Sequence, residues 1–212
     1  CRTFSHLEHV ALAYNNFAGT IPSNFDHGLV SLKTLQLQGN RLEGPLPSLK
    51  VPVAMRRLSL QNNALTGSIP GTFFLRTIMA SDNDEISSHD ETSPIGSSIA
   101  VVTVQLHSNR LNGTIPEVLA RLPVVNLDIT GNPDLMGPLP SQFCTQSAWM
   151  DGHVAALGCD AILCPRNTFH PEGRANVGSP CAPCPYTDDN NKNLGRTECG
   201  NLTYKSAFGQ DN

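Results

Sequence analysis

This chain is poor in charge, in aromatic side chains and in long apolar runs, and each shortage excludes a class of protein. Charged residues make up 15% of its 212 residues and the net charge is −4, so it lacks the basic surface that phosphate binding needs. No apolar run approaches the ~20 residues of a membrane-spanning helix. We therefore expect no nucleic-acid partner and no membrane span within this chain.

Catalytic signatures are also missing. The sequence contains no G-x-S-x-G, no H-E-x-x-H and no phosphate-binding loop. Its seven histidines are scattered, and no pair of carboxylates recurs at regular positions. We therefore expect no catalytic residue, no cofactor and no metal, and hence not an enzyme.

Cysteine is absent between Cys1 and Cys144, whereas six cysteines fall between residues 144 and 199. Clustered cysteines are typical of disulfides formed in an oxidising compartment, and a zinc site, from C-x4-C and C-x2-C, is the rival interpretation. Two glycosylation sequons begin at Asn112 and Asn201. These features predict an extracellular protein, secreted or at the cell surface, and the missing signal peptide suggests a mature or trimmed fragment.

A repeated motif occupies the cysteine-free part. Residues 104–116 read V-Q-L-H-S-N-R-L-N-G-T-I-P, with near copies at 10–22, 35–47, 58–70 and 127–140. The reference asparagines are Asn15, Asn40, Asn63, Asn109 and Asn132, spaced by 25, 23, 46 and 23 residues. A degenerate copy around Asn83 divides the long interval, which predicts six coils of a repeat protein.

Three columns of the repeat are apolar in every copy, at eight, five and three residues before the asparagine. The last two columns are two residues apart, which indicates a strand with one face inward that only stacked neighbours can bury. A buried asparagine amide both donates and accepts, so it can satisfy backbone groups in the turning chain. The glycine after it predicts a turn with an unusual backbone conformation.

The G-x-[IL]-P element after N-x-L resembles the plant-type leucine-rich repeat of receptor-kinase ectodomains and polygalacturonase-inhibitor proteins. The resemblance covers roughly residues 1–143 and implies an α/β fold, a right-handed solenoid of six coils with a parallel sheet on its concave face. Residues 1–6 would be the remnant of an N-terminal cap, in which Cys1 stands where the second cysteine of the family's cap pair would be. Residues 144–212 would form a cysteine-rich C-terminal cap.

The tail resembles ephrin-receptor-like and tumour-necrosis-factor-receptor-like cysteine modules, and the combination is similar to repeat proteins of diatoms and related algae. This resemblance implies the disulfides Cys164–Cys181 and Cys184–Cys199, which leaves Cys144–Cys159. The tail must also shield the last coil, because an open solenoid end exposes apolar core. The side chains expected to form this plug are Phe143, Trp149, Met150, Val154 and Leu157.

Outward strand positions form a nearly neutral, hydrogen-bonding face. The candidate ligand-binding residues there are Gln36, Gln38, Arg57, Gln61, Gln105 and His107. The alternative is that they are simply solvated strand residues. Seven residues before the asparagine stand three basic residues: Lys33, Arg56 and Arg76. We expect them to stack as a basic column, about 4.8 Å apart, that binds an anionic ligand. The alternative is that the acidic segment 82–91 neutralises them.

The leading hypothesis is an extracellular recognition module that binds a protein, peptide or glycan through its concave face. The alternative is a structural subunit of a cell-surface, cell-wall or filament assembly formed by self-association. A third is adsorption to a surface such as ice through the threonines Thr34, Thr77 and Thr103, a column that Arg57 interrupts. The acidic segment 82–91 is either a tolerated insertion or a weak candidate for calcium.

Overall fold

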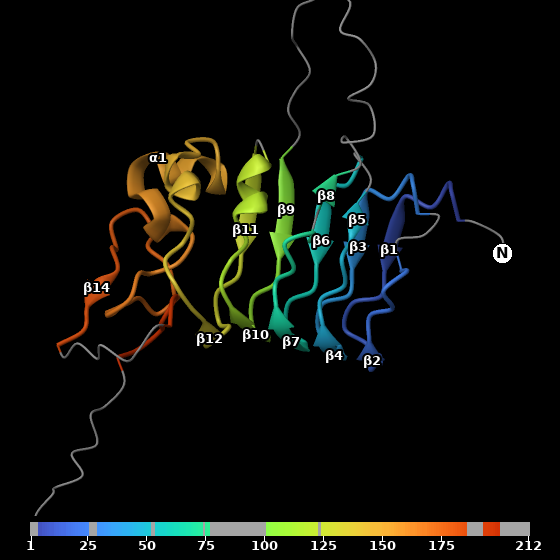
Figure 1. Cartoon of the computed structure of the whole chain (residues 1–212), viewed down its shortest axis with the longest axis horizontal. Coiled ribbons are helices and arrows are strands. Elements are labelled where there is room, and N and C mark those ends of the chain that lie inside the picture. Colours follow the sequence, from blue (N-terminus) through green and yellow to red (C-terminus); the bar gives the residue numbers. More distant parts are fainter. Residues whose placement is uncertain are drawn as a thin grey trace, which may run out of the picture.

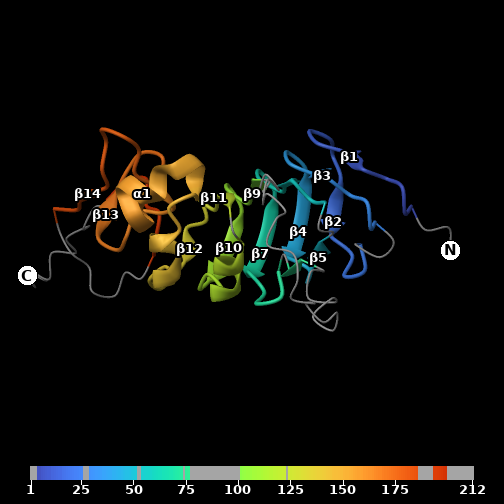
Figure 2. The ribbon, with the colours of Figure 1, turned by 90° about the horizontal axis from the view of Figure 1, so that it is seen from above.

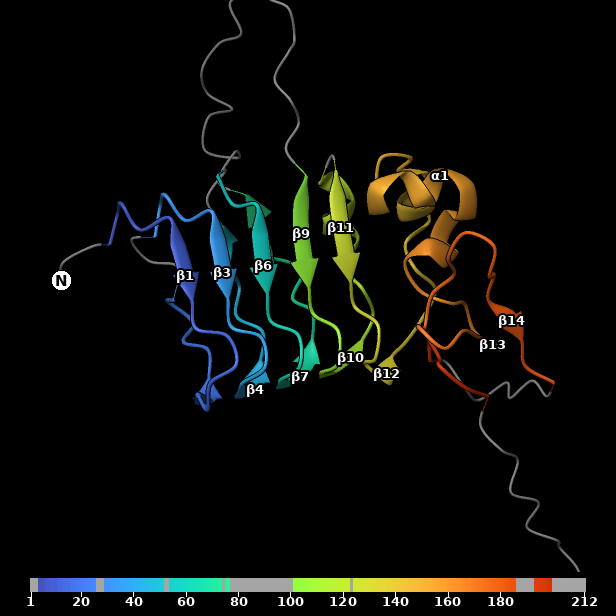
Figure 3. The same ribbon diagram turned by 180° about the vertical axis from the view of Figure 1, so that it is seen from behind.

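The computed structural model describes residues 4–25, 29–51, 54–73, 75–76, 101–122, 124–185 and 193–199. The repeats stack in a single row, with β1 at one end and the cysteine-rich module at the other (Figures 1 and 2). Their first strands form one parallel sheet, visible from behind in Figure 3. In spatial order its strands are β1 (His9–Ala11), β3 (Thr34–Gln36), β6 (Arg57–Ser59), β9 (Val102–Gln105) and β11 (Val125–Asp128).

A second parallel sheet runs along the other side of the row, and sequence analysis did not predict it. It is built from the N-x-L-x-G segments, each of which continues as a strand after the asparagine. Its strands are β2 (Ala18–Thr20), β4 (Arg41–Pro45), β7 (Ala64–Ser68), β10 (Arg110–Gly113) and β12 (Asp134–Leu135). The motif glycines have positive φ, for example 75° at Gly44, which confirms the expected unusual turn.

The apolar columns fill the space between the two sheets, as their periodicity predicted. Leu58, Leu60 and Leu65 of one coil are fully buried. The first coil differs, because it has no coil before it to cover its apolar side chains. Leu7, Leu12 and Phe17 are 37–47% exposed, and Val10, the equivalent of Leu58, is only partly buried. The core therefore ends in an open apolar surface at β1.

From the second coil on, each motif asparagine joins its own coil to the preceding one. The side-chain oxygen of Asn109 accepts from the Leu65 N–H at 3.1 Å, and its nitrogen donates to the Leu60 and Leu106 carbonyls at 3.1 and 3.0 Å. Asn40, Asn63 and Asn132 repeat this pattern in their own coils. The predicted role of the amide in satisfying the turning backbone is confirmed.

The first sheet has five strands among the described residues, one fewer than the six predicted coils would give. β6 pairs directly with β9, with Leu58 opposite Val104, and Asn109 bonds to residues of the third coil. The degenerate copy therefore adds no strand to the first sheet. Its start, β8 (Leu75–Arg76), pairs instead with β5 (Lys50–Val51) in a separate two-stranded sheet, while Asn83 and the acidic segment 82–91 lie outside the described residues.

Helices are short and lie mostly in the module. The one α-helix of the described residues is α1 (His153–Leu157). The 3-10 helices include η2 (Glu117–Arg121), η3 (Ser141–Thr145), η4 (Met150–Gly152) and η5 (Gly158–Ala161), and a short antiparallel pair joins β13 (Thr168–Phe169) to β14 (Ala182–Pro183). Among the described residues, no helix has the length and apolar character needed to cross a membrane.

The module covers the last coil with the predicted plug. Phe143 and Trp149 are fully buried, with ring centroids 5.0 Å apart, and the indole N–H donates to the Leu122 carbonyl at 2.9 Å. Met150 and Val154 are buried, and Leu157 packs against the core. The plug is therefore confirmed: it continues the apolar core beyond β11.

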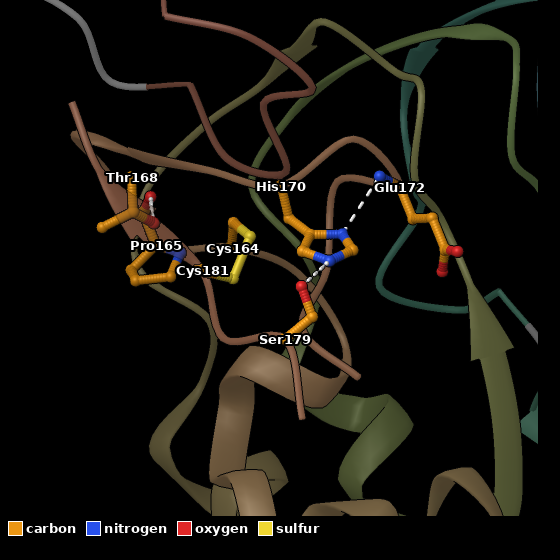
Figure 4. Close-up of a disulfide and its surroundings, with 7 residues drawn as sticks. All are labelled: Cys164, Pro165, Thr168, His170, Glu172, Ser179 and Cys181. Atoms are coloured by element: carbon orange, nitrogen blue, oxygen red, sulfur yellow. Dashed lines mark hydrogen bonds between the residues drawn. A yellow bond between two sulfur atoms is a disulfide. The ribbon is translucent and has the colours of Figure 1, made fainter. Parts of the chain in front are cut away.

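Three disulfides hold the module: Cys144–Cys159, Cys164–Cys181 and Cys184–Cys199, the pairs that the resemblance implied. Beside the second lies His170, which is buried (Figure 4). Its Nδ1 accepts from the Glu172 N–H at 3.1 Å, and its Nε2 lies 3.0 Å from the Ser179 hydroxyl. These two contacts make the imidazole a structural cross-link within the module.

Candidate ligand-binding face

The outward side chains of the first sheet form three rows that cross the strands. The register places Thr34, Arg57 and Thr103 in the first row. The second row contains Gln36, Ser59, Gln105 and Asp128. The third contains Gln38, Gln61, His107 and Thr130, which follow the strands and are joined by backbone hydrogen bonds such as Gly39 N–H to the Gln61 carbonyl.

The centre of this surface is an uncharged polar patch, which we call the amide face. Its members are Gln36, Gln38, Ser59, Gln61, Gln105 and His107. The structure thus places five of the six predicted ligand-binding residues in one patch. The sixth, Arg57, lies exposed at the beginning of β6, in the first row.

Three side chains of the amide face are hydrogen-bonded together. The Ser59 hydroxyl donates to Gln105 Oε1 at 3.0 Å, and Gln61 Nε2 donates to the same oxygen at 3.3 Å. His107 Nδ1 lies 3.2 Å from the hydroxyl of Ser108. Ser59 is a member of the cluster that was not among the predicted ligand-binding residues.

Two amide oxygens on this face have no donor. Gln38 and Gln61 are 9% and 8% exposed, yet the Oε1 of each accepts no hydrogen bond from any residue that the structure describes. A buried acceptor without a donor destabilises the free protein by about 1–3 kcal/mol. Such groups are uncommon in folded proteins, and they concentrate here on the surface predicted to bind a ligand.

The module closes the face at β11. Asn126 and Asp151 exchange two hydrogen bonds, at 2.9 and 3.1 Å, and Arg174 forms an ion pair with Asp128 at 3.4 Å. Asp128 Oδ1 also accepts from the Thr130 N–H and hydroxyl. All three outward residues of the last coil are therefore engaged, and the open part of the face extends from β1 to β9.

The predicted basic column is wrong as a contiguous feature. The neighbour of Arg56 in the next strand is Val102, which is fully buried, and Arg76 lies in β8 of the small separate sheet. Lys33 is paired with Glu8 at 2.8 Å, and this hydrogen bond, with the lysine charge, lowers the pKa of the Glu8 carboxyl. The register confirms that Arg57 interrupts the threonine column between Thr34 and Thr103, and Thr77 lies outside the described residues.

A cavity of about 480 Å³ lies between the last coil and the module, remote from the amide face. It is lined mainly by apolar atoms, with the Cys144–Cys159 disulfide and Asp160 at its wall. Burial raises the pKa of the Asp160 carboxyl. Within the described ranges no group of three or more His, Cys, Asp or Glu residues could hold a metal ion.

The two sequons differ in their position. Asn112 is exposed on β10 of the second sheet, opposite Ser68 and Asp134, so its side chain is on a different sheet from the amide face. Asn201 lies outside the described residues. Glycosylation at either site stays a prediction.

Comparison with known proteins gives relatives of one kind. A model of the leucine-rich repeat matches residues 31–50 and 54–75. Leucine-rich repeat receptor protein kinase MSL1 of Oryza sativa subsp. japonica is 36% identical over 125 residues, and Pollen receptor-like kinase 2 of Arabidopsis thaliana is 30% identical over 133 residues. These alignments cover 57% and 60% of this chain but only 8% and 20% of the relatives.

Among solved structures, the crystal structure of PEPR1–AtPEP1 superimposes with a TM-score of 0.52 at 26% sequence identity. The match covers 68% of this chain and 17% of that one. The chain thus spans a fifth or less of each of these proteins. The five stacked coils of the described residues, their asparagine ladder and these relatives agree, and the repeat region has the fold of plant-type leucine-rich repeats.

Proposed function

We propose that the chain is an extracellular recognition module that binds a peptide or an extended protein segment across the amide face. The observation that carries this proposal is the row of uncharged donors and acceptors that crosses β3, β6 and β9, centred on the linked side chains of Ser59, Gln61 and Gln105. An extended peptide carries N–H and C=O groups along its whole length, so it can match such a row. Catalysis is no part of the proposal.

Its extracellular location is supported by two features. The three disulfides need an oxidising compartment. The Asn112 sequon is exposed on the second sheet, where a glycan would leave the amide face free. The two relatives are named as receptor kinases, and by analogy this chain would serve as the binding part of a larger protein.

A random linear peptide library, selected against the full disulfide-bonded chain, tests the proposal. Thr103→Trp places a bulky ring in the first row at the middle of the open face, and Ser68→Trp places the same ring at an exposed position of the second sheet. We expect enriched peptides to bind the parent and the Ser68→Trp control but not Thr103→Trp. The proposal fails if no peptide is enriched, or if the Thr103→Trp variant binds as the parent does.

Self-association is the second candidate, and the open end of the solenoid favours it. Leu7, Leu12 and Phe17 are exposed there, and among the described residues β1 has a strand partner on one side only. Apolar surface and an unpaired strand edge together promote association. Light scattering after size-exclusion chromatography, across a range of concentrations, separates the candidates: a constant monomer mass excludes assembly through this end.

A further inference from the structure

We propose that Gln38, Gln61 and Gln105 form an uncharged subsite that binds an amide group of the ligand, either a peptide-backbone amide or an Asn or Gln side chain. This inference rests on the proposed function, because it assigns ligand chemistry to the same face. It makes hydrogen-bond complementarity, rather than charge, the basis of recognition.

The orientation of the Gln105 amide is fixed by its neighbours. The Ser59 hydroxyl and Gln61 Nε2 both donate to Gln105 Oε1, so this oxygen faces Ser59 and Gln61. The Gln105 nitrogen is then directed away from them, and donates to no residue within the described ranges. Gln105 therefore offers a donor to a carbonyl oxygen of the ligand.

Gln38 and Gln61 offer the complementary acceptors. Their side chains are nine-tenths buried and neither Oε1 receives a donor from the described residues. The terminal torsion of a glutamine is broad, so the Gln38 amide can turn its oxygen towards an incoming N–H. The Gln61 amide keeps its nitrogen on Gln105 and offers its oxygen in that orientation. A ligand that supplies this N–H removes a penalty that the free protein carries, and the gain appears as affinity.

The surroundings favour a peptide over a charged ligand or a glycan. The outward positions of β3 and β9 carry no charged side chain, and the one charge on the three strands, Arg57, lies in the first row at the beginning of β6. A ligand charge seated on the three glutamines would therefore lose water without gaining a counter-ion from them. No aromatic ring stands on β3, β6 or β9 on which the C–H face of a sugar could stack. An amide group brings one donor and one acceptor. These are the partners that the Oε1 atoms of Gln38 and Gln61 and the nitrogen of Gln105 lack.

The test uses the full, isotope-labelled chain with its disulfides intact, and follows the glutamine side-chain amide resonances. The probe is acetyl-Gly-Asn-Gly-Asn-Gly-amide, with acetyl-Gly-Asp-Gly-Asp-Gly-amide and a neutral glucose hexasaccharide as comparisons. We expect the asparagine peptide to shift the resonances of Gln61 and Gln105, and the hexasaccharide to leave them unchanged. A smaller shift with the aspartate peptide would assign the site to a side-chain amide, and an equal shift would assign it to a backbone amide. An equal response to the hexasaccharide, or no response to the asparagine peptide at its solubility limit, would overturn the inference.

Two variants separate binding from folding. Gln38→Met removes a donorless oxygen while keeping the length of the side chain, and Gln105→Met removes the outward donor. Each should weaken the asparagine peptide by about fivefold or more, the worth of one neutral hydrogen bond. Gln38→Met should melt at or above the temperature of the parent, whereas Ser68→Met, at an exposed position of the second sheet, should leave binding within about twofold.

Unchanged affinity in both Gln38→Met and Gln105→Met would overturn the subsite. That failure differs from failure of the proposed function. Library-selected peptides that are lost in Thr103→Trp but retained in both glutamine variants would leave the recognition module standing and remove only its amide subsite.

Discussion

Asn109 is the position where the ladder that holds the coils together can be tested most directly. Replacement by alanine leaves the Leu65 N–H without its acceptor inside the core. The Leu60 carbonyl loses one of two donors, since Asn63 still reaches it. The Leu106 carbonyl keeps a bond from Asn132. The His107 carbonyl loses a third, longer bond of 3.3 Å. Asn109→Ala therefore creates one orphaned buried donor and weakens three acceptors.

These losses set the expected magnitude. An orphaned buried group costs about 1–3 kcal/mol and each lost neutral hydrogen bond about 0.5–1.5 kcal/mol. We expect Asn109→Ala to lower the free energy of unfolding by about 3 kcal/mol. That is a large fraction of the ~5–15 kcal/mol that stabilises a typical domain. At ordinary urea slopes the midpoint should fall by about 1–2 M.

Asn15 provides the matched control. It occupies the same motif position in the first coil, but it is exposed and its side chain bonds only to the nearby Leu12 and Ala13 carbonyls. Asn15→Ala should cost less than about 1 kcal/mol. Unfolding can be followed by circular dichroism and by fluorescence of Trp149, the single tryptophan. A difference between the two variants below about 0.5 kcal/mol would refute the ladder argument.

Three further predictions concern the module and the first coil. Replacing Cys144 and Cys159 by alanine should cost about 3 kcal/mol, because the disulfide closes a loop of 15 residues; urea titration measures it. Lys33→Met should return the lowered pKa of Glu8 towards its ordinary 4.5, which an NMR titration would show. In the parent, the stabilisation from the Lys33–Glu8 pair should be lost as the pH falls through that lowered pKa. Asp160→Asn should raise the melting temperature near neutral pH but not below pH 3.8, because burial opposes only the ionised carboxylate.

Each of these predictions has an outcome that contradicts it. An unchanged urea midpoint after loss of Cys144–Cys159 would mean that the plug, not the disulfide, holds the module. A Glu8 pKa insensitive to Lys33→Met would mean that the ion pair is not populated in solution. A melting temperature in Asp160→Asn that is equal to the parent at every pH would mean that the carboxylate is solvated.

Sequence alone predicted the features that repeat. Period-two columns placed Leu35, Leu58 and Leu127 in the core, and the same alternation placed Gln36, Ser59 and Gln105 on the outside. These predictions succeeded because every coil solves the same packing problem, so a pattern in sequence becomes a row in space. The second sheet was missed because its strands lie in the turn-rich half of the motif, where Gly and Pro argue against regular structure.

The features that occur once could not be predicted. The closure of the face at β11 depends on Asp151 reaching Asn126 and Arg174 reaching Asp128, contacts made only when the module docks on the last coil. No local pattern marks these pairs. The basic column failed for a related reason: counting by period assigned Arg76 to the strand after β6, whereas tertiary pairing assigned that place to Val102.

The missing sixth strand is what creates the amide face. Neighbouring strands are about 4.8 Å apart, so a strand between β6 and β9 would hold Ser59 and Gln105 roughly 10 Å apart, beyond hydrogen-bond reach. The same strand would place Met79, an apolar side chain, between them in the row. Because β9 follows β6 directly, Ser59 and Gln61 instead converge on the Gln105 oxygen. The break in the repeat thus brings together side chains from the third coil and the next, and the uncharged cluster proposed as the ligand site depends on it.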